Sequence, residues 1–301
     1  MKKIIYILLI ILTILGLWYF VIKSHDYQVS FESKNPKGII YEHIAQWNGG
    51  KPFSHHVLKN IEKTPFHSIT QDYTFSKDST MRIDWELKKK NDSITKVKGY
   101  FTSMNSSLNQ RFKILFGKAN FASQSIDFSK KLKMYIERQN ERFKLSKIDT
   151  ANFEYRKYIY RTVSTTIDNK AKKMLMENGM IMNYMFQNEL SLDGYPFLEL
   201  TSWDKTTDSI QFNFCYPIKK RHISTNNSIV YSEKDSFKSL RIIYNGNFRT
   251  SHLAWYAYDD YFEKNNEKKK LLPIEVFLND PQQGGDELTW RTEIYLPISN
   301  N

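Results

Sequence analysis

The stretch "LPIEVFLNDP", residues 272–281, places one carboxylate, that of Glu275, inside an otherwise apolar run. β-Branched and aromatic residues followed by Asn-Asp-Pro are typical of a strand that ends in a turn. A glutamate in such a strand costs free energy unless it is paired, hydrogen-bonded or wetted by solvent. Two interpretations follow: an edge strand with Glu275 in water, or a polar floor at the bottom of a pocket.

The composition predicts two folded domains without metals or disulfides. The chain has 301 residues, of which 41% are hydrophobic and 15% aromatic, enough for two sizeable cores. The single cysteine, Cys215, excludes an intramolecular disulfide and is expected to be an inert buried thiol. No Cys/His spacing predicts a zinc site, so we expect no metal and no cofactor. Four histidines are expected to be ordinary surface or core residues: His43, His55, His56 and His67.

The net charge is +12, and much of it lies between Lys118 and Lys173, where 14 Lys and Arg face 6 Asp and Glu. Such a segment could meet anionic lipid or nucleic acid. A solvated helix face is the commoner explanation, and we favour it. Because the sequence has no recognisable DNA-reading motif and no glycine-rich phosphate loop, we expect no nucleic-acid partner.

The N-terminus predicts a membrane anchor over residues 1–25. Nineteen uncharged residues, 4–22, are long enough to cross the hydrocarbon core as a helix, and Trp18 and Tyr19 lie near the far end, where aromatic rings favour the interface. Since no small-x-small site or lipobox cysteine follows, we expect an uncleaved single-pass anchor rather than a signal peptide. The lysines at positions 2 and 3 favour an extracytoplasmic body, although further lysines after the anchor weaken that asymmetry.

The first expected domain, 27–147, follows a helix-grip order of elements. The pattern predicts a strand at 27–31, a helix at 36–47, strands at 67–75, 79–90, 94–104 and 110–117, and an amphipathic helix at 125–143. With "NPKGIIYEHIAQWNGGKPF", residues 35–53, this order resembles the START-like superfamily, also called SRPBCC. The resemblance implies a sheet curled around the long helix, and lipid binding in an apolar cavity as one alternative function.

The second expected domain, 150–301, contains a repeat, so the whole chain is expected to be α+β. The first half predicts a strand, a helix and two strands at 153–165, 171–190, 195–203 and 210–218, and the second half repeats this order at 237–248, 252–265, 272–280 and 288–298. Two such units can pair their sheets about a pseudo-two-fold axis, with a groove between their helices.

The second domain resembles the GyrI-like family, the bacterial transcription-activator effector-binding domain. The motifs that carry the resemblance are "GYPFLELTSW", "YNGNF", "HLAWYAYDDYF", "LPIEVFLNDP" and "ELTWRTEIYLPI". It implies a groove that binds small, often aromatic or cationic molecules, with Glu275 as the matching glutamate. Family regulators place a helix-turn-helix domain first. In this chain an anchor and a START-like pattern precede the second domain instead, so we expect no helix-turn-helix and no nucleic-acid partner.

Glu275 is the expected polar contact of this groove. Aligning the halves on Pro196 and Pro273 makes Leu198 the counterpart of Glu275. Strand alternation separates Glu275 from Ile274 and Val276; with those two facing the helices, Glu275 is expected on the other face, in a groove. Aromatic rings add cation–π attraction of about 0.5–2 kcal/mol each, although such rings are more often core. The candidate rings are Tyr158, Tyr160, Tyr244, Trp255 and Phe277.

The sequence therefore predicts a membrane-anchored protein that binds a small hydrophobic or cationic ligand. Hydrolysis with Glu275 as general base is the alternative from another class, so whether the protein is an enzyme stays open. Lipid binding in the START-like domain is the second alternative.

Overall fold

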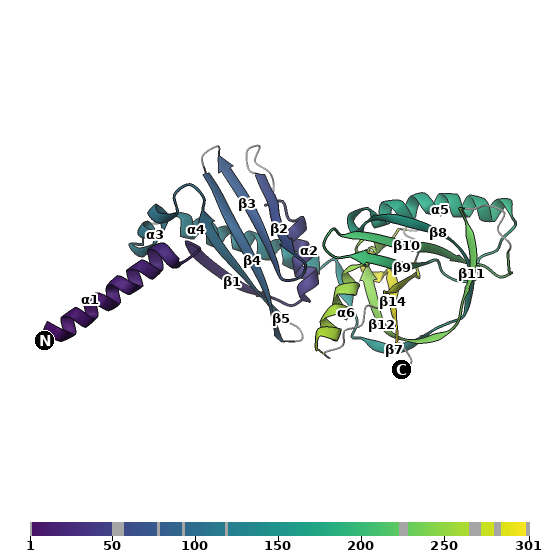
Figure 1. Cartoon of the computed structure of the whole chain (residues 1–301). Helices are drawn as coiled ribbons and strands as arrows, with labels where there is room; N and C mark the ends of the chain where they lie inside the picture. The colour runs from purple at the N-terminus through teal and green to yellow at the C-terminus, as the bar shows by residue number, and fades with distance from the viewer. Residues whose placement is uncertain are drawn as a thin grey trace. The chain divides into compact units, whose positions relative to one another are not determined.

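A computed structural model describes residues 2–49, 57–76, 79–91, 94–117, 120–222, 228–264, 272–279 and 284–298. The chain forms two compact units, Met1–Arg138 and Gln139–Asn301, and both are built from antiparallel sheets and helices (Figure 1). The expected α+β class is therefore confirmed.

An apolar helix begins the first unit. Helix α1, Lys2–Leu17, continues into the π-helical turn η1, Trp18–Ile22. The segment Lys3–Ile22 has a mean hydropathy of 2.7, and none of it is buried inside the protein. It has the length and composition of a single-pass span, and a signal sequence shares these properties. The side of the membrane on which the body lies stays a prediction.

The rest of the first unit is a five-stranded sheet with its core on one face. The strand order is β1 (Tyr27–Ser33), β5 (Ile94–Ser103), β4 (Ser79–Asn91), β3 (Ser68–Ser76) and β2 (Val57–Thr64). The helices are α2 (Lys37–Gln46), α3 (Ser107–Leu115) and α4 (Asn120–Asn140). Strict burial alternation along β5 turns one face to the core, where Phe128 of α4 packs against Trp47 and Tyr73, each at a ring distance of 4.8 Å.

One expectation for this unit is wrong, and one strand was missed. Residues 110–117 were expected to be a strand, but α3 occupies most of that segment. Leu108, Phe112 and Leu115 recur at the spacing of one helix face, and this period outweighs the local alternation of apolar residues. The edge strand β2 was not expected, because its sequence "VLKNIEKT" is polar and largely exposed.

In its described residues, the second unit is a nine-stranded sheet with two α-helices. Its order is β11-β8-β10-β9-β13-β14-β12-β6, and β7 also pairs with β12. The strands are β6 (Phe143–Leu145), β7 (Asp149–Phe153), β8 (Arg156–Thr166), β9 (Phe197–Asp204), β10 (Ser209–Pro217), β11 (Val230–Lys234), β12 (Phe237–Gly246), β13 (Ile274–Phe277) and β14 (Arg291–Pro297). Helix α5 spans Lys170–Gln187 and α6 spans Leu253–Lys264. The sheet begins at Phe143, before the expected domain start at residue 150.

The two halves meet at β9 and β13, which pair antiparallel with Glu275 directly opposite Leu198. On either side of this pair, the Phe277 amide donates to the Pro196 carbonyl at 3.0 Å, and the Leu200 amide donates to the Pro273 carbonyl at 3.1 Å. These matching hydrogen bonds relate the two strands by a local two-fold axis through the Glu275–Leu198 pair.

The faces of this sheet are the reverse of those expected. Ile274 and Val276 pack in a cluster with Phe153, whose ring stacks on Phe237 at 5.0 Å. Strands β7 and β12 therefore supply the apolar layer on that face, and the Glu275 side chain points to the face that carries the starts of α5 and α6. The predicted alternation of side chains along the strand was correct. The expectation that Ile274 and Val276 face the helices was wrong, because the unexpected strand β7 covers them instead.

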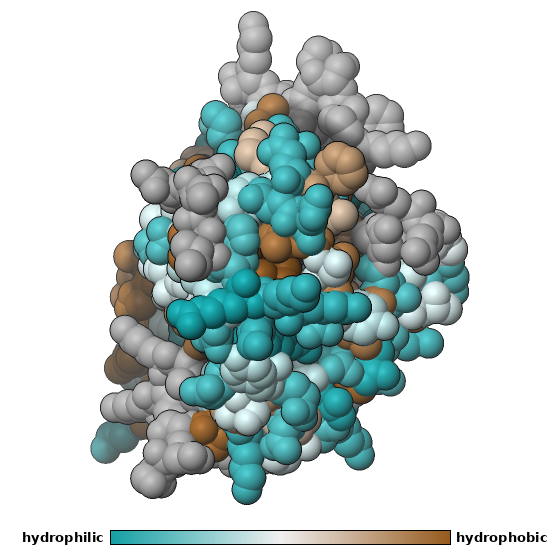
Figure 2. Space-filling model, turned by 90° about the vertical axis from the view of Figure 1, so that its right-hand side faces the viewer, coloured by the Kyte–Doolittle hydropathy of each residue, from teal (hydrophilic) through white to brown (hydrophobic). Residues whose placement is uncertain are grey.

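The face of this unit that Figure 2 shows is mostly hydrophilic. Figure 2 looks onto the side where β11 and the end of α5 lie, and hydrophilic residues surround a small hydrophobic hollow there.

Candidate functional site

Glu275 lies in a buried ion pair. Its side chain has no exposed surface, and the Lys170 ammonium, also fully buried, lies 3.1 Å from Oε1 and 3.0 Å from Oε2. The Ser251 hydroxyl is 2.8 Å from Oε2 and accepts a hydrogen bond from Lys170 at 2.8 Å. The carboxylate is thus neither an exposed edge residue nor the open floor of a groove; it is desolvated and neutralised by an internal cation.

Equivalent positions in the two halves supply Lys170 and Ser251. The 3₁₀ turn Ile167–Asn169 precedes Lys170, and the 3₁₀ turn Phe248–Thr250 precedes Ser251. A lysine in the first turn of a helix faces the positive end of the helix dipole, which is unfavourable. Its ion pair with Glu275 offsets that repulsion.

Trp255 completes this cluster. Its ring is buried, with the Lys170 ammonium 5.1 Å from the ring centroid, within the range of a cation–π contact. Trp203 packs edge-on against Trp255, with ring centroids 5.4 Å apart. A carboxylate and an indole thus surround one ammonium group.

A second carboxylate, Asp259 of α6, repeats this arrangement nearer the surface. The Lys205 ammonium lies 2.6 Å from Asp259 Oδ2 and 4.6 Å from the centroid of the Trp203 ring. The side chains of Lys205 and Asp259 are 37% and 36% exposed. Desolvation by burial raises the pKa of the Asp259 carboxyl, Lys205 opposes that rise, and Glu263 adds to it.

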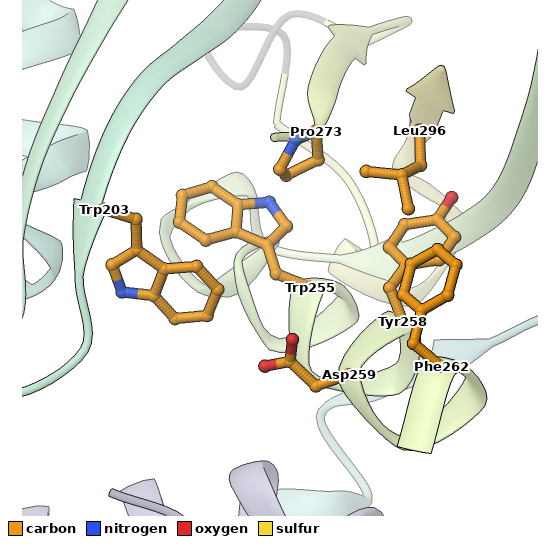
Figure 3. Close-up of a pocket in the computed structure, with 7 residues that line it drawn as sticks. All are labelled: Trp203, Trp255, Tyr258, Asp259, Phe262, Pro273 and Leu296. Atoms are coloured by element: carbon orange, nitrogen blue, oxygen red, sulfur yellow. The ribbon is translucent and has the colours of Figure 1, made fainter. Parts of the chain in front are cut away.

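A small cavity of about 20 Å³ lies beside these groups, with room for about one water molecule. It is lined by Trp203, Trp255, Tyr258, Asp259, Phe262, Pro273 and Leu296. In Figure 3 the Asp259 carboxylate points toward the tryptophans, and the indole nitrogen of Trp255 points toward Pro273. That buried N–H has no hydrogen-bond partner among the residues that the structure describes, so an acceptor placed in the cavity would satisfy it.

The other expected ring residues divide between the two faces of the sheet. The Tyr244 hydroxyl is 2.7 Å from Thr250 Oγ1, before α6, and the Phe277 ring lies edge-on to Phe248. Tyr158 belongs to the cluster of Ile274 and Val276, and Tyr160 packs against that cluster, so both lie on the face opposite Glu275. The structure therefore brings Trp255 to Glu275, holds Tyr244 and Phe277 nearby, and separates Tyr158 and Tyr160; their ligand contacts stay predictions.

Five residues of these clusters were missed from the sequence: Lys170, Trp203, Lys205, Ser251 and Asp259. One signal was available for Lys170. A lysine in the first turn of a predicted helix is repelled by the positive end of the helix dipole, so an acidic partner is expected near it. An alignment of the two repeats at the starts of their helices would also have identified Lys170 and Ser251 as equivalent positions.

Cys215, His43 and His67 lie outside this site. Cys215 is buried, which raises the pKa of its thiol, and the thiol contacts the Asn213 carbonyl at 3.4 Å. His43 is buried and His67 is exposed, while His55 and His56 lie outside the described residues. No group of three or more metal-ligating side chains occurs within the described part of the chain.

No protein-family model and no curated protein matches the sequence. Among solved structures, the C-terminal domain of EcmrR is similar at 14% identity and a TM-score of 0.44, over 52% of this chain and 98% of that chain. SAV2435 bound to tetraphenylphosphonium is similar at 10% identity and a TM-score of 0.34, over 52% of this chain and 95% of that chain. These likenesses agree with the GyrI-like resemblance at a coarse level and do not show a START-like first unit.

The similar structures also correct one expectation about partners. A complex of EcmrR with DNA is similar at 13% identity and a TM-score of 0.43, over 64% of this chain and 72% of that chain. The expectation of no nucleic acid and no helix-turn-helix, which rested on domain order and missing short motifs, is therefore wrong as an exclusion. A nucleic-acid-binding surface needs no short sequence signature, so its absence excluded nothing.

Proposed function

We propose that this protein is a membrane-anchored sensor whose second unit binds a small organic cation beside Trp255, in place of an internal lysine ammonium. The observation that carries the proposal is a repeated geometry. Lys170 lies between Glu275 and Trp255, and Lys205 lies between Asp259 and Trp203. Each carboxylate–indole pair already holds an ammonium group, so each has the charge and ring surface that an organic cation requires.

Asp259 is the carboxylate at which the ligand enters. Removing one partner of a fully buried ion pair costs about 3–5 kcal/mol, whereas exposed pairs contribute about 0–1 kcal/mol. The Lys205–Asp259 pair is about one-third exposed, so its ammonium exchanges at a far lower cost than that of Lys170. Glu275 is then the inner carboxylate, which a ligand reaches only when Lys170 moves.

The lining of the cavity indicates the kind of cation. Phe262, Tyr258 and Leu296 offer apolar and aromatic surface, and the Trp255 N–H offers one hydrogen bond. A cation with apolar or aromatic substituents fits this lining, and an acceptor atom on it would in addition satisfy the Trp255 N–H. Because the cavity itself has room for about one water, the Lys205 side chain leaves when such a ligand binds.

The alternatives receive less support. A general base needs a free lone pair facing water, but in the fully buried Glu275 side chain Oε1 contacts Lys170, and Oε2 contacts Lys170 and Ser251. We retain the START-like resemblance of the first unit as part of the proposal. Lipid binding there needs an apolar cavity, and the rings of Trp47, Tyr73 and Phe128 pack into the space beside α4.

The experiment is a titration of the full chain, in mild detergent, with tetraphenylphosphonium, a permanent cation with four apolar rings. Asp259→Asn is expected to weaken binding about ten-fold, because a charge-assisted contact is lost. Asp193→Asn, which removes an exposed carboxylate of the same unit, is the control and should bind like wild type. Equal dissociation constants for wild type and Asp259→Asn would overturn the proposal.

A further inference from the structure

Helix α3 of the first unit carries an exposed apolar stripe. Three members lie at helical positions i, i+4 and i+7, and the fourth is the residue that caps the helix; they are 64%, 57%, 60% and 59% exposed: Leu108, Phe112, Leu115 and Phe116. On another side of α3, Ile114 packs against the core of the unit. Soluble proteins seldom leave a contiguous apolar stripe in water, so this one marks an interaction surface.

The stripe continues the surface of the apolar N-terminal helix. The ring of Phe20, near the end of that helix, lies 6.5 Å from the ring of Phe112, which lies 4.9 Å from that of Phe116. The Tyr19 hydroxyl also donates to the Arg111 carbonyl at 3.2 Å. Apolar side chains, with the half-buried Phe20 as the link, thus run from the N-terminal helix onto α3.

A buried arginine fixes this arrangement. Arg111 of α3 donates to the carbonyls of Tyr19 and Phe20 at 3.1 and 3.2 Å, where the helix ends and its carbonyls lack helical partners. Its Nε donates to Asp26 at 2.7 Å, and the fully buried Asp26 also accepts the Ser103 amide and the Ser107 hydroxyl. The end of the apolar helix is therefore part of the folded unit, and α3 is held beside it.

We infer that α3 lies in the interfacial layer of the membrane that the N-terminal helix crosses, with its stripe at the boundary of the acyl chains. This inference rests on the anchor in the proposed function. Twenty residues of helix span about 30 Å, the thickness of the hydrocarbon core, so the end of the span at Ile22 lies at the membrane surface. Since Arg111 holds α3 at that end, lipid is the partner nearest to its uncharged stripe.

The test uses the full chain with Cys215→Ser, reconstituted in phosphatidylcholine vesicles with or without a nitroxide at a shallow acyl position. A polarity-sensitive fluorophore is attached to one new cysteine at a time. Leu115→Cys reports the stripe, Lys113→Cys reports an exposed position of α3 away from the stripe, and Ile10→Cys reports the anchor.

The fluorophore at position 115 should emit at shorter wavelength and be quenched about three-fold more strongly than at position 113. Quenching at position 10 without quenching at 115 would overturn the inference and leave the anchor standing. No quenching at either position would overturn both. A blue shift at position 115 without lipid quenching would assign the stripe to a protein partner, which also overturns the inference.

Discussion

Glu275 and Leu198 oppose each other across β13 and β9, at the point where the two halves of the second unit meet. The repeat is symmetric in backbone but not in chemistry at this point. The half that carries the carboxylate obtains its cation, Lys170, from the other half, and Ser251 at the equivalent position bonds to both. The ion pair therefore joins the two halves through their local two-fold axis.

Removal of one partner of this pair should destabilise the second unit strongly. Lys170→Met leaves a buried carboxylate without a cation, and we expect a loss of about 3–5 kcal/mol in the free energy of unfolding. The double variant Lys170→Met, Glu275→Leu removes both charges, while Ser251 keeps its hydrogen bond to the Phe248 carbonyl, so it should recover most of the loss. Urea denaturation measures these values. A double variant as unstable as the single one would show that the buried charge is not the cause.

A small amine should replace the missing lysine. Lys170→Ala removes the ammonium and the three methylenes beyond Cβ, leaving a space that matches n-propylammonium in charge and shape. A ligand that binds only the folded state raises its stability with concentration, so n-propylammonium should raise the melting temperature of this variant. 1-Propanol is the uncharged control. The same rise in Lys170→Ala, Glu275→Gln would contradict a role for the carboxylate.

Cation binding at Asp259 should weaken in mild acid. Burial raises the pKa of this carboxyl above its ordinary value, so the folded protein holds the proton more tightly than a solvated aspartate does. Only the ionised form attracts a cation, and affinity should therefore fall as pH decreases, starting above the usual carboxyl range near about 4. Tetraphenylphosphonium does not titrate, so its dissociation constant between pH 4 and 8 reports protein groups alone. If Asp259→Asn shows the same pH dependence of binding as wild type, the titrating group is not Asp259.

The second unit should need the residues just before its expected boundary. Phe143 of β6 stacks on Tyr244, and β7 pairs with β12 from Phe153↔Phe237 to Asp149↔Arg241. A fragment 139–301 should unfold cooperatively on heating. A fragment 154–301 lacks both strands and should melt at a clearly lower temperature. Equal melting temperatures would show that β6 and β7 do not stabilise the unit.

The repeat of the second unit could be predicted because its prolines fix the register. Pro196 and Pro273 identified Leu198 as the counterpart of Glu275, and the two side chains prove to be direct cross-strand neighbours. Lys170 lies 105 residues from Glu275, and no local pattern encodes a contact over that separation. The faces were reversed because β7 gives little alternation, although its Phe153 supplies the apolar layer over Ile274 and Val276.

The first unit shows the same limit at α3. Phe112, Ile114 and Phe116 alternate like a strand, while Leu108, Phe112 and Leu115 follow a helix. The tertiary contacts of Arg111 with Asp26 and the end of the apolar helix decide between the two periods, and these partners lie about 85 residues or more away in sequence. The stripe became recognisable only once the helix was in place.

The measurement that tests cation exchange most directly is a double-mutant cycle between Asp259 and Lys205, read as the dissociation constant of tetraphenylphosphonium. Lys205→Met removes the competing internal cation, so it should tighten binding about three- to ten-fold when Asp259 is present. In the Asp259→Asn background, where no carboxylate is left to compete for, the same substitution should change the dissociation constant little. An equal effect of Lys205→Met in both backgrounds would contradict exchange at Asp259.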